Sequence, residues 1–249
     1  MKTALITGAA RGIGLATARG LQEAGWQVAL MDRDGAELEK AAGQLPDSLV
    51  IEGDVSQSQD VTAAVAKVTE QFGRLDGLVN NAGVADFGPI RETTFDRWRR
   101  VMETNLDGPF LMTQAFTELL AAQGGGAVVN ITSISGLRAS TLRVAYGTSK
   151  AALAHLTLQQ AAELGELGIR VNGVAPGPVA TKLAMAVHSP EIISAYHDAL
   201  PLNRYGTEDE IAEAINFLLS DKASFITGQI LAADGGFEAT GIGLPALRS

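Results

Sequence analysis

Three side chains in the middle of the chain are of the types that hydride transfer at an alcohol carbon requires. Tyr146 and Lys150 stand four residues apart, and Ser133 lies thirteen residues before Tyr146. A phenol has an ordinary pKa of about 10, so it needs a nearby cation before its phenolate can act as a base near neutral pH. Positions i and i+4 of a helix share one face, which predicts that the Lys150 ammonium lies beside the Tyr146 phenol. We expect Ser133 to hydrogen-bond the substrate oxygen.

A glycine-rich turn near the start of the chain predicts a dinucleotide site. The apolar run 3–7 suits a buried strand, and Gly8, Gly12 and Gly14 follow it directly. Gly8 permits a tight turn, Gly12 leaves room for a pyrophosphate, and Gly14 lets the next helix pack closely on the strand. A second apolar run ends in Asp32, eighteen residues after Gly14. That is near the spacing of about 20 expected for the carboxylate that binds an adenine ribose.

Apolar runs that suit strands alternate with amphipathic segments along the whole chain, without a composition break or internal repeat. This alternation is typical of βαβ units in a parallel sheet. It predicts a single α/β domain over residues 1–249, with a Rossmann-type, doubly wound, mostly parallel sheet of seven strands and helices on both faces. The expected strands lie near residues 3–7, 27–32, 48–52, 75–80, 126–132, 169–175 and 229–232.

The motifs that carry chemistry follow the ends of expected strands. Ligands of open α/β sheets bind beyond the carboxyl ends of the strands, so motifs placed there converge on one edge. The residues that follow strands one, two, four, five and six are Gly8, Asp32, Asn80, Ser133 and Pro176. Each alone could be a turn or loop residue, but together they predict one active site.

Composition excludes several other classes of protein. Hydrophobic residues make up 46% of the chain and charged residues 19%, which is typical of a folded domain. Cysteine is absent, and His188 and His197 lack the spacing of metal ligands, so we expect neither a disulfide framework nor a metal. The formal net charge of -9 argues against nucleic acid as a partner. We find no apolar run long enough for a membrane span and no signal peptide, and we expect a cytoplasmic protein.

Several motifs in a fixed order give the chain a resemblance to a known family. They are Thr7-Gly-Ala-Ala-Arg-Gly-Ile-Gly14, Asp54-Val55, Asn80-Asn-Ala-Gly83, Asn105, Ser133, Tyr146 with Lys150, Arg170-Val-Asn-Gly-Val-Ala-Pro-Gly177, Thr181 and Asp234-Gly-Gly236. With these motifs the sequence resembles the short-chain dehydrogenase/reductase family over nearly its whole length. No single motif is decisive, but chance agreement of all of them in this order is negligible.

The resemblance implies a role for each catalytic residue. Tyr146 acts as general base when an alcohol is oxidised and as general acid in the reverse direction. Lys150 lowers the pKa of Tyr146 and holds the nicotinamide ribose, while Ser133 orients the substrate oxygen. Asn105 positions a water that links Lys150 to solvent. The resemblance also implies a dinucleotide site made of Gly8, Arg11, Gly12, Ile13, Gly14, Asp32, Asp54, Val55, Asn81, Ala82, Gly83, Tyr146, Lys150, Pro176, Gly177, Val179 and Thr181.

The choice between NAD and NADP depends on the residues near the adenine ribose. A carboxylate at the end of the second strand accepts hydrogen bonds from the ribose hydroxyls and repels a 2'-phosphate, so Asp32 favours NAD. Arg11 and Arg33 favour NADP instead, because an arginine near the adenine ribose can pair with the 2'-phosphate. We give the carboxylate more weight and predict NAD.

The substrate pocket is expected to form from the loops 84–88 and 135–143 and the segment 182–204, which would act as a mobile lid. Its polar candidates are Asp86, Arg138, Arg143, His188 and His197, and its apolar candidates are Val84, Leu183, Met185 and Tyr196. Each charged residue could instead be a solvated loop side chain. We predict a polyol or sugar-like secondary alcohol in contact with Ser133, Arg143, Tyr146 and His188. The tail 237–249 could reach the pocket of a neighbouring subunit.

The helix that carries Tyr146 and Lys150 is apolar on more sides than one sheet face needs. Its small and apolar residues are Ala151, Ala152, Leu153, Leu156, Leu158, Ala161 and Ala162. We therefore expect a second subunit to cover part of it, with burial within its own chain as the alternative. The family resemblance implies a homotetramer.

The leading interpretation is an NAD-dependent dehydrogenase of a secondary alcohol. An NADPH-dependent 3-oxoacyl-thioester reductase is the enzymatic alternative. A dinucleotide-sensing scaffold without turnover is a more distant one, and it is disfavoured because competent residues occupy all four catalytic positions, Asn105, Ser133, Tyr146 and Lys150.

Overall fold

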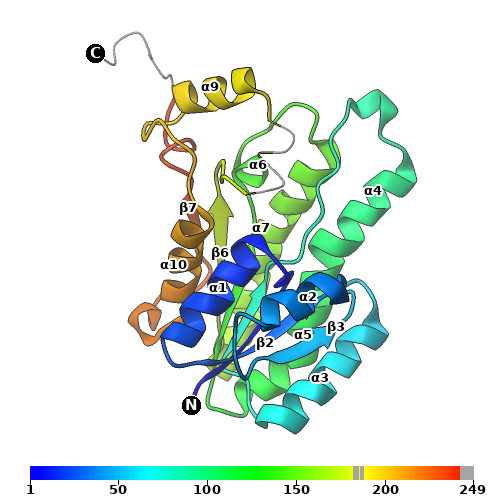
Figure 1. The fold of residues 1–249 in the computed structure, drawn as a ribbon, viewed down its shortest axis with the longest axis vertical. Helices are drawn as coiled ribbons and strands as arrows, with labels where there is room; N and C mark the ends of the chain where they lie inside the picture. Colours follow the sequence, from blue (N-terminus) through cyan, green and yellow to red (C-terminus); the bar gives the residue numbers. More distant parts are fainter. Residues whose placement is uncertain (182–184, 186–187, 242–249) are drawn as a thin grey trace.

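The computed structural model describes residues 1–181, 185 and 188–241, and within them seven strands form one parallel sheet (Figure 1). The strand order is β3-β2-β1-β4-β5-β6-β7, and every neighbouring pair is parallel. The bounds are β1 Thr3–Thr7, β2 Gln27–Asp32, β3 Leu49–Glu52, β4 Gly77–Asn80, β5 Ala127–Ile131, β6 Arg170–Pro176 and β7 Ile230–Ala233. The order reverses direction at β1, as in a doubly wound Rossmann fold, so the predicted fold is confirmed.

Helices cover both faces of this sheet. They are α1 Gly12–Glu23, α2 Gly35–Ala42, α3 Ser58–Phe72, α4 Phe95–Met102, α5 Gly108–Ala121, α6 Ile134–Leu137, α7 Val144–Leu164, α9 Pro190–Ala199 and α10 Glu208–Leu219. Short 3-10 turns lie at η1 Ile90–Glu92, η3 Gly165–Leu167 and η4 Asp221–Ala223, and a π-helical turn, η2 Glu103–Asp107, joins α4 to α5. Helix α9 lies beyond the carboxyl end of β6 (Figure 1).

Two buried apolar clusters hold these layers together. On one face, Ile6 of β1 packs with Leu21 of α1 and Ile215 of α10. On the other face, Leu5 of β1 packs in the cluster that contains Phe116 of α5. Adjacent residues of β1 thus serve opposite faces, because side chains of a strand alternate. The burial of each such large side chain stabilises the fold by about 1.5 to 3 kcal/mol.

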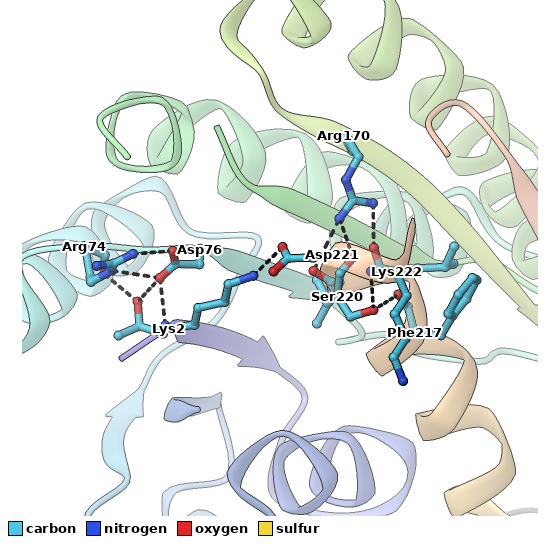
Figure 2. Close-up of polar contacts among 11 residues, drawn as sticks. Lys2, Arg74, Asp76, Arg170, Phe217, Ser220, Asp221 and Lys222 are labelled. Carbon is cyan, nitrogen blue, oxygen red and sulfur yellow. Dashed lines mark hydrogen bonds and ion pairs between the residues drawn. The ribbon is translucent and has the colours of Figure 1, made fainter. Parts of the chain in front are cut away.

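Polar contacts lie at the amino-terminal ends of the strands, as Figure 2 shows for Lys2, Asp76 and Arg170. The chemical motifs follow the opposite, carboxyl ends of the strands. Lys2 pairs with Asp221 at 2.5 Å, and Arg74 pairs with Asp76 at 2.6 Å. The Asp76 carboxylate also accepts a hydrogen bond from the backbone N–H of Thr3 at 2.8 Å. The ladder between β1 and β4 starts at the pair Ala4 and Gly77, so β4 begins at Gly77 and not at residue 75 as predicted.

Candidate active site

The turn between β1 and α1 is packed so tightly that only glycine fits. Gly8 has a φ of +64°, and a Cβ on it would lie 2.8 Å from Asn81 Nδ2. A Cβ on Gly14 would lie 2.3 Å from the Gly8 carbonyl oxygen. The Asn81 amide donates hydrogen bonds to the carbonyls of Thr7 and Gly8, at 2.9 and 3.1 Å, and so ties the turn to the end of β4. Sequence reasoning named Asn81 as a cofactor residue but did not foresee this bracing.

Gly12 differs from its neighbours because the space beside it is open. It has a φ of +62°, and the nearest atom to a Cβ built there is Glu208 Oε1 at 3.6 Å. Gly12 also begins α1, where the first backbone N–H groups have no partner within the helix. Open space beside unpaired N–H donors fits a pyrophosphate, as the glycine spacing predicts.

One cavity of about 970 Å³ brings the expected cofactor and catalytic residues together. It lies along the carboxyl edge of the sheet. The predicted residues that line it are Gly8, Arg11, Gly12, Ile13, Asp32, Asp54, Val55, Asn81, Ala82, Gly83, Ser133, Arg143, Tyr146, Lys150, Pro176, Gly177, Val179, Thr181 and His188. Gly14 and Asn105 do not line it: Gly14 lies beneath the turn, and Asn105 is wholly buried.

At the end of the cavity beside β2, where the sequence predicts the adenosine, both nearby arginines pair with carboxylates. Arg11 forms an ion pair with Asp34, and Arg33 lies 3.9 Å from Asp54. Asp32, the last residue of β2, accepts hydrogen bonds from the backbone N–H groups of Ala10 at 3.2 Å and Asp34 at 3.0 Å. The two arginines therefore already face negative charge, and the Asp32 carboxylate remains at the cavity wall.

Tyr146 and Lys150 lie in the first two turns of α7 and face the same side, as their spacing predicts. Lys150 Nζ is 5.9 Å from the centroid of the Tyr146 ring. However, the ammonium donates its hydrogen bond to the Ile131 carbonyl at 2.7 Å. Burial lowers the pKa of Lys150 to about 8, so its charged form still predominates at pH 7.

The electrostatic surroundings of Tyr146 differ from the sequence-based expectation. Burial raises the pKa of the Tyr146 phenol, while a hydrogen bond with Ser133 and the charge of Arg143 lower it in part. The lowering of this pKa by Lys150 stays a prediction; the Lys150 ammonium donates its hydrogen bond to the Ile131 carbonyl, at the end of β5. Arg143 therefore influences the phenol in a way that the Tyr-x-x-x-Lys spacing did not suggest.

Ser133 and Asn105 are both buried. Ser133 follows β5 and caps α6, with its Oγ accepting from Ser135 N at 3.1 Å. Asn105 lies in the π-helical turn η2, where Oδ1 accepts from Val84 N at 2.8 Å and Nδ2 donates to Ser149 Oγ at 3.0 Å. Asn105 thus holds the backbone of Val84, which lines the cavity. Its expected role in positioning a water stays a prediction.

An arginine and several rings form the substrate end of the cavity. Arg143 donates hydrogen bonds to Ser135 Oγ and to the Tyr196 hydroxyl, each at 3.1 Å, and its guanidinium lies 4.8 Å from the centroid of the Phe87 ring. His188 stacks on Tyr196 with centroids 5.6 Å apart. Burial and the charge of Arg143 lower the pKa of His188, which keeps its imidazole neutral at pH 7. Sequence reasoning named the loop 84–88 but overlooked Phe87, the aromatic residue within it.

Three other predicted polar residues do not reach the cavity. The Asp86 carboxylate forms ion pairs with Arg97 and Arg100 of α4, because those arginines lie directly across from the loop. Arg138 pairs with Glu238 at 3.4 Å. The His197 ring packs at 5.6 Å from the Tyr205 ring, and His197 is not among the residues that line the cavity. The interpretation of these three as pocket residues was wrong.

Of the apolar candidates, Val84 and Tyr196 line the cavity, whereas Met185 does not. Leu183 lies outside the described residues, as do residues 182–184 and 186–187 of the expected lid and 242–249 of the expected tail. The described part of the lid includes α9. Within the tail, Glu238 binds Arg138, and the proposed contact with another subunit stays a prediction.

The described part of the chain offers no cluster of three or more His, Asp or Glu residues placed to hold a metal ion. Across those same residues, we find no helix with the length and apolar character needed to cross a membrane.

The fold and the site define a nicotinamide-dependent oxidoreductase: a glycine turn at a helix start, a carboxylate after β2, and a Ser, Tyr and Lys set in the same cavity. The family model described as enoyl-(acyl carrier protein) reductase matches residues 8–238. The chain belongs to the short-chain dehydrogenase/reductase family.

Three relatives illustrate the range of substrates within this family. 2-(S)-Hydroxypropyl-CoM dehydrogenase 3 of Xanthobacter autotrophicus is 39% identical and covers 94% of this chain and 95% of its own. Galactitol 2-dehydrogenase (L-tagatose-forming) of Cereibacter sphaeroides is 40% identical and covers 94% of both chains. The 3-oxoacyl-[acyl-carrier-protein] reductase FabG of Staphylococcus epidermidis is 36% identical and covers 94% of this chain and 98% of its own. These three relatives are about equally identical to this chain but are named for different substrates, so overall identity does not indicate which substrate this chain uses.

Proposed function

We propose that this enzyme interconverts a secondary alcohol and its ketone with NAD, and that the alcohol is a polyol or a sugar-like compound. The observation that carries the proposal is the single cavity lined both by the glycine turn with Asp32 and by Ser133, Tyr146 and Lys150. That arrangement supports hydride transfer between a bound dinucleotide and a substrate held at the tyrosine.

Each catalytic residue has a task that its surroundings support. Tyr146 takes the alcohol proton on oxidation and returns a proton to the carbonyl oxygen on reduction. Ser133, which hydrogen-bonds Tyr146, is placed to share the substrate oxygen with it. Lys150, charged at pH 7, would hold the nicotinamide ribose. When bound, the dinucleotide supplies the hydride acceptor or donor.

NAD is favoured by the charges at the adenosine end. The Asp32 carboxylate stands at the cavity wall, and a 2'-phosphate there would meet like charge. Arg11 and Arg33, the residues that could favour NADP, each face a carboxylate of this chain. A phosphate would therefore have to compete for both of them.

The polar substrate end supports a hydroxylated substrate. Arg143 and the Tyr196 hydroxyl line it, and galactitol 2-dehydrogenase is a relative of 40% identity. The 3-oxoacyl-thioester reductase is the second candidate, favoured by the FabG relative and expected to prefer NADPH. A scaffold without turnover is disfavoured, since the catalytic side chains share the cavity.

Turnover assays distinguish these functions. The purified enzyme is offered NAD and NADP with polyols, sugars and 3-hydroxyacyl thioesters, and nicotinamide reduction is followed by absorbance. We expect the highest kcat/KM with NAD and a polyol or sugar. A higher kcat/KM with a thioester and NADP would favour the 3-oxoacyl-thioester reductase. If no alcohol is turned over, the scaffold without turnover is the remaining candidate.

We further propose that the enzyme acts in the cytoplasm as a homo-oligomer, most simply a tetramer, with a small molecule and neither nucleic acid nor membrane as its partner. On α7, Ala151, Leu158 and Ala162 are exposed and recur along one face of the helix, with the exposed His155 between the first two. Leu158 is 42% exposed. A largely apolar stripe of this kind supports contact with a second subunit.

A further inference from the structure

Arg143 stands out from Arg11 and Arg33, the other arginines that line the cavity within the described residues, because no carboxylate there pairs with it. Arg11 pairs with Asp34, and Arg33 pairs with Asp54. Asp86, in the adjoining loop 84–88, pairs with Arg97 and Arg100 of α4. In a chain with a net charge of -9, Arg143 is thus a cation at the cavity wall that no carboxylate neutralises.

The guanidinium of Arg143 is held in one orientation with donors to spare. Two hydroxyls, Ser135 Oγ and Tyr196 Oη, each accept one hydrogen bond from it, and the Phe87 ring lies against it at 4.8 Å. A guanidinium has five N–H donors in a planar fork, so three of them are not used by these two hydroxyls. Such a preoriented fork matches the two oxygens of a carboxylate better than it matches a single hydroxyl.

Charge is divided between the two ends of the cavity. Its acidic residues, Asp32, Glu37, Asp54 and Glu208, lie along the adenosine half, beside the β1–α1 turn and the ends of β2 and β3. At the substrate end, Arg143 is accompanied by the neutral rings of Phe87, Tyr196 and His188. An anion there would meet the Arg143 guanidinium and no carboxylate among the residues that line that end.

Arg143 is also close to the reacting centre. It precedes Tyr146 by three residues at the start of α7, and its charge lowers the pKa of the Tyr146 phenol. A group bound to Arg143 therefore lies within the length of one small molecule from an alcohol held by Tyr146 and Ser133.

We infer that the substrate carries an oxyanionic group, a carboxylate in the simplest case, that binds Arg143 while Tyr146 and Ser133 hold its alcohol. This inference rests on the proposed function and narrows its substrate class from neutral polyols to hydroxy acids, including sugar acids. Arg143 is then the residue that selects acids over neutral alcohols of the same length.

The test compares hydroxy acids that differ in the number of carbons between hydroxyl and carboxylate. Each acid is paired with the diol in which the carboxylate is replaced by a primary alcohol, and kcat/KM with NAD is measured for both. At the best length, we expect the wild-type enzyme to prefer the acid by about 10- to 100-fold, the range for a charge-assisted hydrogen bond. Arg143→Gln should bring this ratio close to one, and Arg143→Lys should give an intermediate ratio.

Arg138→Gln is the matched control, because Arg138 lies in the same loop region but pairs with Glu238 outside the cavity lining. Its acid-to-diol ratio should remain that of the wild type. Use of a ratio cancels any loss of kcat that arises because Arg143 also affects the pKa of Tyr146. A wild-type ratio near one at every length, or a ratio unchanged by Arg143→Gln, would overturn the inference.

The two proposals can fail separately. If the diols are oxidised and no acid is preferred, the proposed dehydrogenase stands and the inference about the anion fails. If no alcohol is oxidised, the proposed function fails, and calorimetric titration of the NAD-loaded protein with the same acids decides the inference. Binding that weakens about 10-fold or more in Arg143→Gln supports it, whereas binding that is absent or unchanged overturns it.

Discussion

At the scale of single residues, the site depends on how the Tyr146 phenol is surrounded. Burial disfavours its phenolate, and the hydrogen bond with Ser133 and the charge of Arg143 offset part of this effect. The Lys150 ammonium lies near the phenol but directs its hydrogen bond to the Ile131 carbonyl. We therefore expect proton transfer to depend on Tyr146 itself and its neighbours to orient it and adjust its pKa.

Tyr146→Phe tests that role directly. The substitution removes the hydroxyl and preserves the ring, so we expect kcat to fall by about 10²- to 10⁴-fold while NAD affinity stays largely unchanged. Steady-state kinetics and titration of NAD measure the two effects. Retention of more than about a hundredth of the wild-type activity would contradict proton transfer by Tyr146.

Asp32→Ala tests the cofactor preference. Removal of the carboxylate relieves repulsion of a 2'-phosphate, so the ratio of kcat/KM for NAD to that for NADP should fall by about tenfold or more, equivalent to about 1.4 kcal/mol. Asp32→Asn separates charge from hydrogen bonding, since it keeps an acceptor for Ala10 N. A wild-type preference for NADP would contradict the prediction and would indicate that Arg11 and Arg33, and not Asp32, determine the choice of cofactor.

At the scale of elements, helix ends and turns hold the chemical residues in place. Helix α10 packs along α1, the helix that begins at the cofactor turn. Arg170 at the start of β6 donates to the carbonyls of Leu218, Leu219 and Ser220 at 2.7, 3.3 and 3.2 Å (Figure 2). These carbonyls are at the end of α10 and have no partner within the helix, so Arg170 joins that end to the sheet.

Arg170→Met should therefore destabilise the protein, by about 1 to 3 kcal/mol, because the carbonyls at the end of α10 lose their donor. Lys2→Met is the control at the same edge of the sheet (Figure 2), since the Lys2–Asp221 pair is exposed at Asp221 and is expected to contribute little. Urea unfolding followed by circular dichroism gives both values. Equal stability of the two variants would show that the Arg170 contacts add nothing beyond a surface ion pair.

At the scale of the whole molecule, the carboxyl ends of the parallel strands bring motifs from distant parts of the chain together. Helix α7 places Tyr146 and Lys150 in the same cavity. The opposite side of α7 leaves Ala151, Leu158 and Ala162 exposed. That stripe is where we expect the enzyme to meet a second copy of itself, so the proposed interface and the proposed catalytic pair would share one helix.

Leu158→Glu should shift the protein to a smaller assembly, because a charge in an apolar contact between subunits is costly to bury. Light scattering after size exclusion measures the mass. Leu167→Glu is the matched control: Leu167 is 44% exposed, close to the 42% of Leu158, but lies in η3 beyond the stripe. A monomeric wild type, or an unchanged mass in Leu158→Glu, would contradict an interface on this face.

Local features of this enzyme could be predicted from the sequence alone. The strand that ends at Thr7, the glycine turn after it, Asp32 at the end of β2 and the Tyr146–Lys150 pair on one helix face all lie where spacing and periodicity predict. These features depend on steric limits and repeat lengths that act within a few neighbouring residues, so the chain encodes them directly.

Only the tertiary structure decided which charges find partners. Asp86 was a plausible pocket residue, yet it pairs with Arg97 and Arg100, and Arg138 pairs with Glu238, a hundred residues further along the chain. Arg143, in the same region of sequence, is left facing the cavity. Ion pairs form between groups that the fold brings within a few ångströms, and that distance depends on how distant elements pack, which neither residue type nor spacing determines.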